Sequence, residues 1–568
     1  MNRAWIVLML LGCQSCTRSS SSKQRVSILA MTDWHASFGE RETATGAAGG
    51  LPWFAAAVAA RRAVDPDLLL LDAGDGFQGD PMANEQLGQA TVEAFTLLGV
   101  DASAVGNHEF DHGPCRAGVC DDPHPQRGAF RSAARRAEYA YLTANVTDAS
   151  GKAWAPEGVQ ASRIFSRNGV KIGVFGLTSQ DTPTTTKRSG IADLQFTDVV
   201  PAAERTARSL RADGADVVVA LAHVTGDCRD APADAPCVPD GELGRLLTEL
   251  PSGTLDLIIA GHAHQMMQGR VGETVFVEAG SKGAVLGQID VLVDPANGGS
   301  VEVHPRPLWV LDHAPVDPWC SPGTEYPSAP RAVGGVPLEP SAEAISLARK
   351  LEVWNGPGCV EVGCLQSDAL RGPPSAEGHG LGGMVSDALL SAFPDAAVAV
   401  QNAGGLRDDL GAGPVRQRDV DRVMPFRDHA NLVELSGADL LRALEVGTSG
   451  AHGLLLPAGL TYTMSAGDGV ARDLNGDGQR SLWERDRLCS VMVAGEPLDV
   501  SATYSVVVSD FLLGGGDHQS SGLGRGENPE PGMRVADAIR AHITAGGSKC
   551  RMVSDTPRIA VTDCDPDW

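Results

Sequence analysis

The 568-residue sequence has little positive charge and no long hydrophobic run. Lys and Arg together number 46 against 71 Asp and Glu, which gives a formal net charge of −25 at pH 7. Non-specific nucleic-acid binding needs a basic surface, so this balance argues against that class of protein. It suits an extracytoplasmic protein or one that binds cations. The first apolar run, residues 5–11, is too short to cross a bilayer.

Zinc-type cysteine spacing is also missing from the close cysteine pairs. Three pairs lie near each other in the sequence: Cys115 and Cys120, Cys228 and Cys237, Cys359 and Cys364. None of these pairs has C-x-x-C spacing. In an exported chain they predict local disulfides. Three later cysteines, Cys489, Cys550 and Cys564, supply a further bridge whose pairing stays open.

The N-terminus has the pattern of a targeting segment. Arg3 precedes the apolar run, which ends at Gly12-Cys13 and is followed by the serine tract 19–22. This resembles the bacterial lipoprotein signal, in which the cysteine is lipidated. We therefore expect residues 1–24 to be a signal and flexible tether, and the protein to be periplasmic or on the cell surface, anchored at Cys13. A simple secretory signal is the alternative.

Residues 25–293 alternate between apolar, strand-like runs and runs with helical spacing. The strand-like runs are 26–31, 67–71, 100–105, 170–177, 217–223, 255–262 and 275–279; the helical runs are 51–64 and 85–98. This alternation predicts a layered α/β domain. Functional groups are then expected at the carboxyl ends of the strands.

Each of these strand ends carries polar side chains of the kinds that bind metals. The candidates are Asp33, His35, Asp75, Asn107, His223, His262 and His264. Any one alone is most simply a capping or turn residue. Seven of them, each closing an apolar strand, favour a binding site. Carboxylates with neutral imidazoles suit borderline divalent metals, and two metals sharing one carboxylate would use this many ligands.

The stretch 105–111 adds a candidate catalytic pair. His108 can give or take a proton near neutral pH. Asp111, three residues on, can orient it.

Several segments carry a resemblance to known families. They are Thr32-Asp33-x-His35, Gly74-Asp75-x-x-x-Gly79-Asp80, Gly106-Asn107-His108-Glu109-Phe110-Asp111 and Gly261-His262-Ala263-His264, with Ala144-Asn145-Val146, Gly176-Leu177-Thr178 and Asp181-Thr182-Pro183. The first four resemble the calcineurin-like metallophosphoesterases, and the last three resemble their 5′-nucleotidase and UDP-sugar hydrolase branch. The resemblance implies a four-layer β-sandwich flanked by helices, followed by a second α/β substrate-binding domain.

The resemblance also implies roles for the strand-end residues. Asp33, His35, Asp75 and His264 would hold one divalent metal, and Asp75, Asn107, His223 and His262 the other. Zn²⁺, Mn²⁺, Co²⁺ and Mg²⁺ all remain open as the metals. His108 would stabilise charge or protonate the leaving oxygen, and Asp111 would orient it.

The second half resembles the C-terminal domain of the same nucleotidases, in residues 381–388, 398–407, 425–426 and 511–517. By that match Asn402 and Arg407 contact a nucleotide substrate, Phe426 and Phe511 sandwich its base, and Asp517 accepts from the ribose hydroxyls. Three positions depart from the family pattern. Gly383 replaces the usual Asn. Arg371 does not align with the usual second phosphate-binding arginine, and Asp428 stands where Asn often follows Pro-Phe.

These signals divide the chain into a catalytic domain at 25–312, a Pro/Gly-rich linker and hinge helix at 313–353, and a substrate-binding domain at 354–568. Outside the family pattern, residues 473–484 fit a twelve-residue EF-hand calcium loop. Its ligands would be Asp473, Asn475, Asp477, Gln479, Ser481 and Glu484. The alternative is an Asp/Asn/Gly-rich turn between strands.

The resulting expectation is an extracytoplasmic dinuclear-metal phosphohydrolase acting on nucleotides, as a 5′-nucleotidase or UDP-sugar hydrolase. Alternatives on the same scaffold are a 2′,3′-cyclic nucleotide 2′-phosphodiesterase and a sulfur-compound hydrolase. An alternative of another class is a non-catalytic, nucleotide-binding surface lipoprotein. The membrane would be contacted only through the lipid anchor, and the sequence makes no prediction of oligomeric state.

Overall fold

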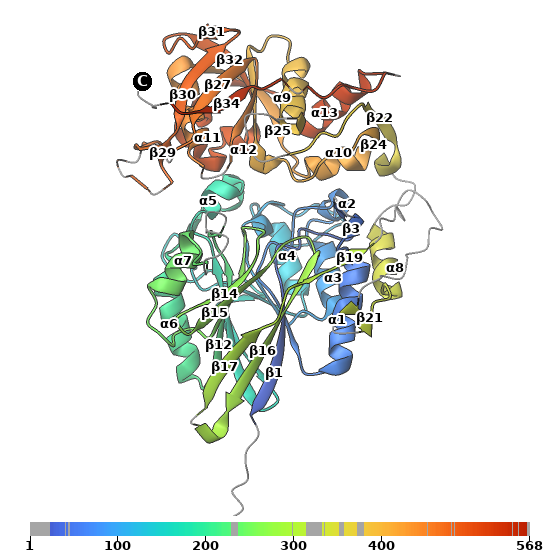
Figure 1. Cartoon of the computed structure of the whole chain (residues 1–568), viewed down its shortest axis with the longest axis vertical. Helices are drawn as coiled ribbons and strands as arrows, with labels where there is room; N and C mark the ends of the chain where they lie inside the picture. Colours follow the sequence, from blue (N-terminus) through green and yellow to red (C-terminus); the bar gives the residue numbers. More distant parts are fainter. Residues whose placement is uncertain are drawn as a thin grey trace, which may run out of the picture.

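The computed structural model describes residues 23–39, 41–43, 46–228, 237–297, 299–313, 332–333, 336–351, 357–371, 380–450, 453–467, 469–476, 478, 480–481, 483–547, 549–554 and 556–564. They form two lobes, with the N-terminal lobe below and the C-terminal lobe above in Figure 1. Residues 1–22 of the predicted signal and tether, including Cys13, lie outside the described residues, whereas Gln24 already belongs to strand β1 (Gln24–Met31). None of the helices described is both long enough and apolar enough to pass through a bilayer.

Two β-sheets make up the centre of the N-terminal lobe. The first has the strand order β17 (Ser300–Pro305), β16 (Val285–Asp294), β1 (Gln24–Met31), β4 (Leu69–Asp72), β5 (Ala102–Ala104), β6 (Ala140–Leu142), β8 (Val159–Gln160). The second has the order β14 (Met266–Val271), β15 (Thr274–Ala279), β13 (Leu257–Gly261), β12 (Val217–His223), β10 (Val170–Thr178), β9 (Ser162–Arg167). Within each sheet the central strands run parallel, so their carboxyl ends meet at one edge.

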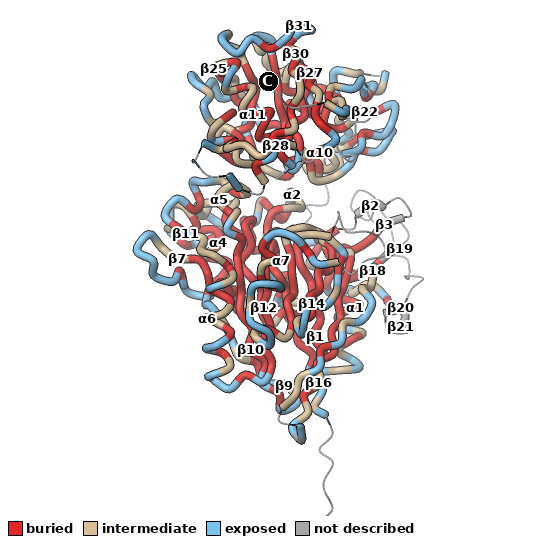
Figure 2. Tube along the Cα trace, turned by 60° about the vertical axis from the view of Figure 1, so that its left-hand side comes forward, coloured by how far each residue is buried: buried red, intermediate tan, exposed pale blue. Residues whose placement is uncertain are grey.

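Successive side chains of each strand point to opposite faces of its sheet, and this alternation creates the layers of the lobe. In β1, Ile28 and Ala30 face a core between the two sheets, whereas Leu29 and Met31 face a core under helices. The helices over the first sheet are α1 (Leu51–Val64), α3 (Gln89–Leu98) and α4 (Gly128–Arg136). Those over the second are α6 (Val199–Ala212) and α7 (Gly241–Thr248). The order helix, sheet, sheet, helix confirms the predicted four layers, and buried chain fills the interior in Figure 2.

The predicted helix at 51–64 is α1, but the predicted helix at 85–98 begins four residues later than expected, as α3. The chain forms α2 (Pro81–Asn84), turns, and restarts as α3. The turn passes through Leu87 at φ 52° and Gly88 at φ 84°. A Cβ at residue 88 would overlap the ring of Phe77, so the turn needs a glycine here.

The C-terminal lobe contains a five-stranded sheet and a four-stranded sheet around one core. The first has the order β26 (Leu455–Ala458), β23 (Val398–Asn402), β32 (Thr503–Ser509), β25 (His429–Ser436), β33 (Glu527–Arg534). The second has the order β31 (Glu496–Pro497), β30 (Leu488–Val493), β27 (Leu460–Ser465), β34 (Ile559–Thr562). The main helices are α9 (Gly380–Ala392), α11 (Gly437–Thr448) and α13 (Val535–Thr544). This separate lobe confirms the predicted second α/β domain.

The helix predicted at 341–353 is α8 (Ala342–Leu351). It packs against α1 and α3, and Ala344 and Ala348 are fully buried in the N-terminal lobe core. The helix therefore belongs structurally to the N-terminal lobe.

Two of the predicted local disulfides are present and one is wrong. Cys115–Cys120 and Cys228–Cys237 are formed. Cys364 bonds to Cys550 rather than to Cys359, across 186 residues of sequence. The cause is strand β22 (Glu361–Leu365), which lies beside residues 550–551 so that the Arg551 amide donates to the Cys364 carbonyl at 2.7 Å. The late cysteine cluster supplies a second bridge, Cys489–Cys564.

Candidate active site

The predicted metal ligands lie where the parallel strands of both sheets end, on turns of unusual backbone geometry. Asp33, His35, Asp75, His262 and His264 all have positive φ, between 49° and 90°. Such values are uncommon for residues with a side chain, and they concentrate at functional sites. Backbone bonds hold the turns: the Asp33 amide donates to the Gly74 carbonyl at 3.0 Å, and the His35 amide to the Asp75 carbonyl at 2.9 Å.

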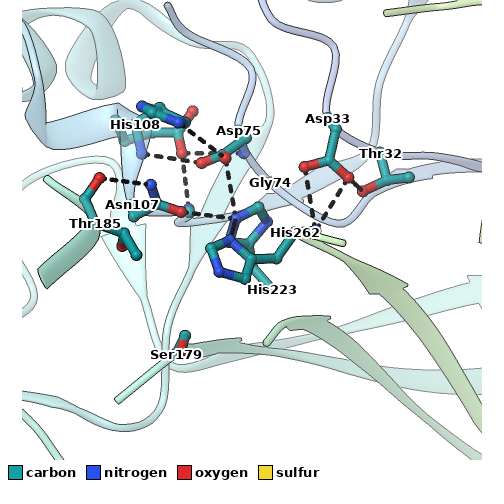
Figure 3. Close-up of polar contacts among 12 residues, drawn as sticks. Thr32, Asp33, Gly74, Asp75, Asn107, His108, Ser179, Thr185, His223 and His262 are labelled. Atoms are coloured by element: carbon teal, nitrogen blue, oxygen red, sulfur yellow. Dashed lines mark hydrogen bonds and ion pairs between the residues drawn. The ribbon is translucent and has the colours of Figure 1, made fainter. Parts of the chain in front are cut away.

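The structure brings the seven predicted ligands together. Asp33, His35 and His264 place one donor atom each within 4.8 Å of one another, and so do Asp75, His223 and His262. The Asn107 Oδ1 atom joins the second group, 3.1 Å from His223 Nε2. Asp75 lies between the groups, with its Oδ2 atom 3.1 Å from His223 Nε2 and 4.0 Å from His35 Nε2. Figure 3 shows the second group and Asp33 converging from separate loops.

The orientation of these side chains fits divalent cations. His35 Nδ1 lies 2.8 Å from the Gln78 carbonyl and His223 Nδ1 lies 3.0 Å from the Ala73 carbonyl. A proton on each Nδ1 satisfies these carbonyls and turns the Nε2 lone pairs inward, as in protein metal sites. The Asn107 amide donates to the Thr185 carbonyl at 3.3 Å, which leaves its oxygen facing the site.

Charge in the site favours the metal-binding forms of two of these side chains, Asp75 and His262, whereas the carboxylates of Asp75 and Asp33 outweigh burial and raise the pKa of His223 to about 10. Burial raises the pKa of Asp75, but the imidazoles of His223 and His108 outweigh it and hold that pKa well below its usual range. Burial and the nearby His223 lower the pKa of His262 to about 3. The carboxylate is therefore ionised and this imidazole neutral near pH 7, the forms that bind divalent metals.

His108 and Asp111 form a hydrogen-bonded pair beside this cluster. A short 3₁₀ turn, η1 (His108–Phe110), places them on one face, with His108 Nδ1 2.5 Å from Asp111 Oδ2. Burial lowers the pKa of His108, but the carboxylates of Asp75 and Asp111 outweigh it and raise the pKa. His108 can therefore carry a proton, and its Nε2 atom lies 3.9 Å from Asp75 Oδ2.

Glu109, between the two, is a structural residue that the sequence reasoning missed. Its buried carboxylate accepts the amides of Gly106 at 2.7 Å and Gly76 at 2.8 Å, and also those of Asp75 and Phe77. One side chain thus ties the turn after β4 to the turn after β5. Buried main-chain amides need hydrogen-bond acceptors. The position of Glu109 in a turn at the end of a buried strand could therefore have indicated this structural role.

The C-terminal lobe reaches directly into the site. Arg407 places Nη2 3.0 Å from His108 Nε2, and Lys282 of the N-terminal lobe donates to the Arg407 carbonyl at 2.7 Å. The Arg407 guanidinium lies over the ring of Phe426, 5.2 Å from its centroid. The charged group is thus held against an aromatic face beside His108 and Asp111.

A cavity of about 780 Å³ runs between the lobes, a size suited to a small-molecule ligand. It is lined by Asp75, Asn107, His108, Asp111, His262 and His264 of the N-terminal lobe and by Asn402, Arg407, Phe426, Phe511 and Asp517 of the C-terminal lobe. The Asn402 amide donates to Asp517 Oδ2 at 2.8 Å. All five predicted substrate-binding residues therefore face the same space as four of the predicted metal ligands, Asp75, Asn107, His262 and His264.

Comparison with known families accounts for both lobes. Residues 26–266 match the family described as calcineurin-like phosphoesterase, and residues 362–521 match the 5′-nucleotidase C-terminal domain. The chain belongs to the 5′-nucleotidase branch of the calcineurin-like phosphoesterases. Both halves of the resemblance found in the sequence are thereby confirmed.

Relatives of this 5′-nucleotidase-family chain are distant. It is 25% identical over 531 residues to endonuclease YhcR of Bacillus subtilis, covering 91% of this chain and 39% of the relative. It is 25% identical over 479 residues to a 5′-nucleotidase of Vibrio cholerae, covering 79% of this chain and 77% of the relative. The crystal structure of a 5′-nucleotidase precursor from Thermus thermophilus superposes with a TM-score of 0.73 at 23% identity, covering 94% of this chain and 99% of that chain. The first three curated relatives are longer, and the chain spans 30–63% of their length.

Arg371 and Asp428 depart from the family pattern, and the structure shows which residues each of them contacts. Arg371 lies 3.4 Å from the Asp409 carboxylate and donates to the Leu406 carbonyl at 3.3 Å. Asp428 lines the cavity and pairs with Lys187 of the N-terminal lobe at 2.9 Å. The family's asparagine position is therefore part of an ion pair between the lobes.

The calcium-type loop of this 5′-nucleotidase-family chain closes a small hairpin, β28 (Val470–Ala471) with β29 (Arg485–Asp486), rather than linking two helices. Asp473 accepts the amides of Gly476 and Gly478. Glu484, fully buried, accepts those of Leu474, Asn475 and Ser481. The predicted ligands Asp477 and Gln479 lie outside the described residues.

Proposed function

We propose that the protein is an exported phosphohydrolase that uses two divalent metals to hydrolyse nucleotides, as a 5′-nucleotidase with UDP-sugars as further substrates. One observation supports this most strongly. Arg407 of the C-terminal lobe lies 3.0 Å from His108, at the point where the ligand cluster opens into the shared cavity. Arginine binds phosphate through two parallel hydrogen bonds, so a phosphate here would meet the guanidinium, the imidazole and the metal ligands together.

In this proposal Asp33, His35, Asp75 and His264 hold one cation, and Asp75, Asn107, His223 and His262 hold the other. Their nitrogen and oxygen donors suit Zn²⁺, Mn²⁺ or Co²⁺, and Mg²⁺ remains open. Bound divalent cations supply Lewis acidity and neutralise phosphate charge for in-line displacement at phosphorus.

The chain itself would bind the nucleotide and move the proton. Arg407 binds the phosphate, Phe426 and Phe511 stack on the base, and Asp517, held by Asn402, accepts from the ribose hydroxyls. In this structure Arg407 donates to His108 Nε2 at 3.0 Å. Once the guanidinium binds phosphate instead, His108, held by Asp111 and protonated at Nε2, donates to the leaving oxygen. The ring centroids of His108 and Phe426 lie 5.9 Å apart, which supports this assignment of neighbouring roles.

A substrate panel tests the reaction. Phosphate release should be measured with AMP, UDP-glucose and 2′,3′-cyclic AMP, each with added Mn²⁺, Zn²⁺, Co²⁺ or Mg²⁺. We expect turnover of AMP. Preference for the cyclic ester would instead identify the phosphodiesterase alternative, and nucleotide binding without any turnover would identify the binding lipoprotein.

Replacing Phe511 with Ala tests the assignment of the base site. Stacking contributes about 1–3 kcal/mol per base, so KM for AMP should rise roughly tenfold or more while kcat changes little. The matched control is p-nitrophenyl phosphate, which has no nucleobase, and its kcat/KM should be the same for wild type and variant. An equal loss on both substrates would show that Phe511 only supports the fold.

We further propose the domain division 25–312, 313–353 and 354–568, and export with a lipid anchor at Cys13. The disulfides support export, because such bonds persist in oxidising compartments.

Calcium binding at residues 473–484 is also proposed. Calorimetric titration with Ca²⁺ should show one site that Glu484→Gln weakens by at least about tenfold, because this position supplies the bidentate ligand of such loops. Asp499→Asn, an exposed acid outside the loop, is the matched control and should leave the titration unchanged. A wild-type protein that takes up no Ca²⁺ would make the loop a plain turn.

A further inference from the structure

Residues 181–187 form a short bridge in the N-terminal lobe between the catalytic groups and the C-terminal lobe. This segment contains α5 (Thr182–Thr185), and we call it the docking segment. It follows strand β10 and packs against η6 (Gly516–Ser521), the C-terminal-lobe segment that carries Asp517. The proposed reaction uses none of its side chains.

The ends of the docking segment contact the C-terminal lobe through charged groups. Lys187 Nζ lies 2.9 Å from Asp428 Oδ1 and 3.4 Å from Asp510 Oδ2. At the other end, Asp181 Oδ1 lies 3.4 Å from His518 Nε2. These contacts are partly buried, which reduces their screening by solvent.

His518 is itself held in place, next to the proposed ribose-binding residue. Its ring stacks on Trp483, with centroids 4.0 Å apart and planes 14° apart. Asp517 and His518 both have positive φ, 51° and 59°. This backbone is costly for residues with side chains and persists because surrounding contacts hold it, so the position of His518 is tied to that of Asp517.

The middle of the docking segment holds two groups of the active site. The Thr185 carbonyl accepts from the Asn107 amide at 3.3 Å, a contact drawn in Figure 3. The Thr186 hydroxyl, on a residue only 2% exposed, donates to Asp111 Oδ1. The first contact turns the Asn107 oxygen toward the metal cluster, and the second fixes the carboxylate that orients His108.

We propose that Thr185 and Thr186 are positioning residues, and that docking of the C-terminal lobe on residues 181–187 sets the geometry of Asn107 and of the His108–Asp111 pair. Asp111 is thus linked through Thr186 and Lys187 to Asp428, beside the base-binding Phe426. The inference rests on the proposed function for its kinetic consequence, whereas the coupling itself belongs to the fold. By this coupling, His108 is oriented for proton transfer only when the C-terminal lobe is docked on the docking segment.

A kinetic cycle tests the coupling with Thr186→Val, Lys187→Met and the double variant. Thr186→Val should lower kcat about tenfold or more with little change in KM, because a small misplacement of a catalytic group is costly. Thr186→Ser, which keeps the hydroxyl, should restore most of kcat. If Lys187 acts through Thr186, the double variant should have the kcat of Thr186→Val alone. Additive losses would overturn the proposal, as would failure of Thr186→Ser to restore kcat.

Hydrogen exchange gives a readout that needs neither substrate nor metal. In metal-free protein, Lys187→Met should speed amide exchange of residues 104–112 about two- to fivefold, the size expected from losing the partly buried ion pairs of Lys187 with Asp428 and Asp510. Lys350→Met removes another ion-paired lysine, 3.1 Å from Glu93, and should leave that peptide unchanged. Unchanged exchange in Lys187→Met would refute the coupling even if nucleotides are hydrolysed, and faster exchange would support it even if they are not.

Discussion

Replacing His108 with Ala should lower kcat for nucleotide hydrolysis by about 10²–10⁴-fold, while KM stays within roughly threefold of wild type. His108 is the group whose Nε2 atom faces both Arg407 and Asp75. Its other nitrogen is fixed 2.5 Å from Asp111, so the ring has one orientation and a raised pKa. A protonated imidazole held in this way can donate to a leaving oxygen, whereas alanine offers no replacement donor.

The measurement is steady-state kinetics on AMP with saturating metal. His304→Ala is a suitable control, because His304 is exposed and its closest charged partner is Glu302 at 3.5 Å on the far strand β17. That variant should match wild type. A His108→Ala enzyme that kept a tenth or more of wild-type kcat would remove His108 from the proposed chemistry.

Asp75→Asn should abolish binding at both metal positions and reduce turnover by at least about 10³-fold. The Asp75 carboxylate lies between the two groups of ligands, and its Oδ1 atom also accepts the His108 amide at 2.9 Å. An amide at this position has no negative charge to share between two cations. Metal content per chain, measured by mass spectrometry after equilibration with Mn²⁺ or Zn²⁺, should fall from two towards zero.

The control for this variant is another buried, hydrogen-bonded acid. Asp290, 3% exposed, accepts from Arg25 at 2.8 Å and from Arg306 at 2.7 Å within the first sheet. Asp290→Asn should lower the unfolding temperature and keep both metals. An Asp75→Asn protein that still bound two equivalents would contradict a shared, bridging carboxylate.

The sequence predicted which candidate ligands would lie together because strand ends can be found from local pattern. Each apolar run that stops at Asp33, Asp75, Asn107, His223 or His262 is a strand whose carboxyl end lies at the same edge, so proximity follows from topology. The two-lobe organisation followed from motifs in each half. Roles of single residues remain predictions that the variants above test.

Features that depend on distant pairing could not be predicted in the same way. Cys364 finds Cys550 because β22 lies beside the end of the chain, which no local spacing encodes. The break between α2 and α3 depends on the Phe77 ring lying against Gly88. The pairing of Lys187 with Asp428 needs both lobes in place. Each of these features depends on contacts between residues that are separated in the sequence. The end of a strand, in contrast, can be recognised from neighbouring residues in the sequence.

The left-handed turns that present the ligands are held by bonds between main-chain atoms. Asp33 and His35 are tied to Gly74 and Asp75 through amides and carbonyls, which nearly every amino acid possesses. Mutation of the Asp33 or His35 side chain would keep these two main-chain bonds. Turns held in this way let evolution replace metal-binding side chains one at a time. Related proteins can then bind different ions while keeping the same backbone.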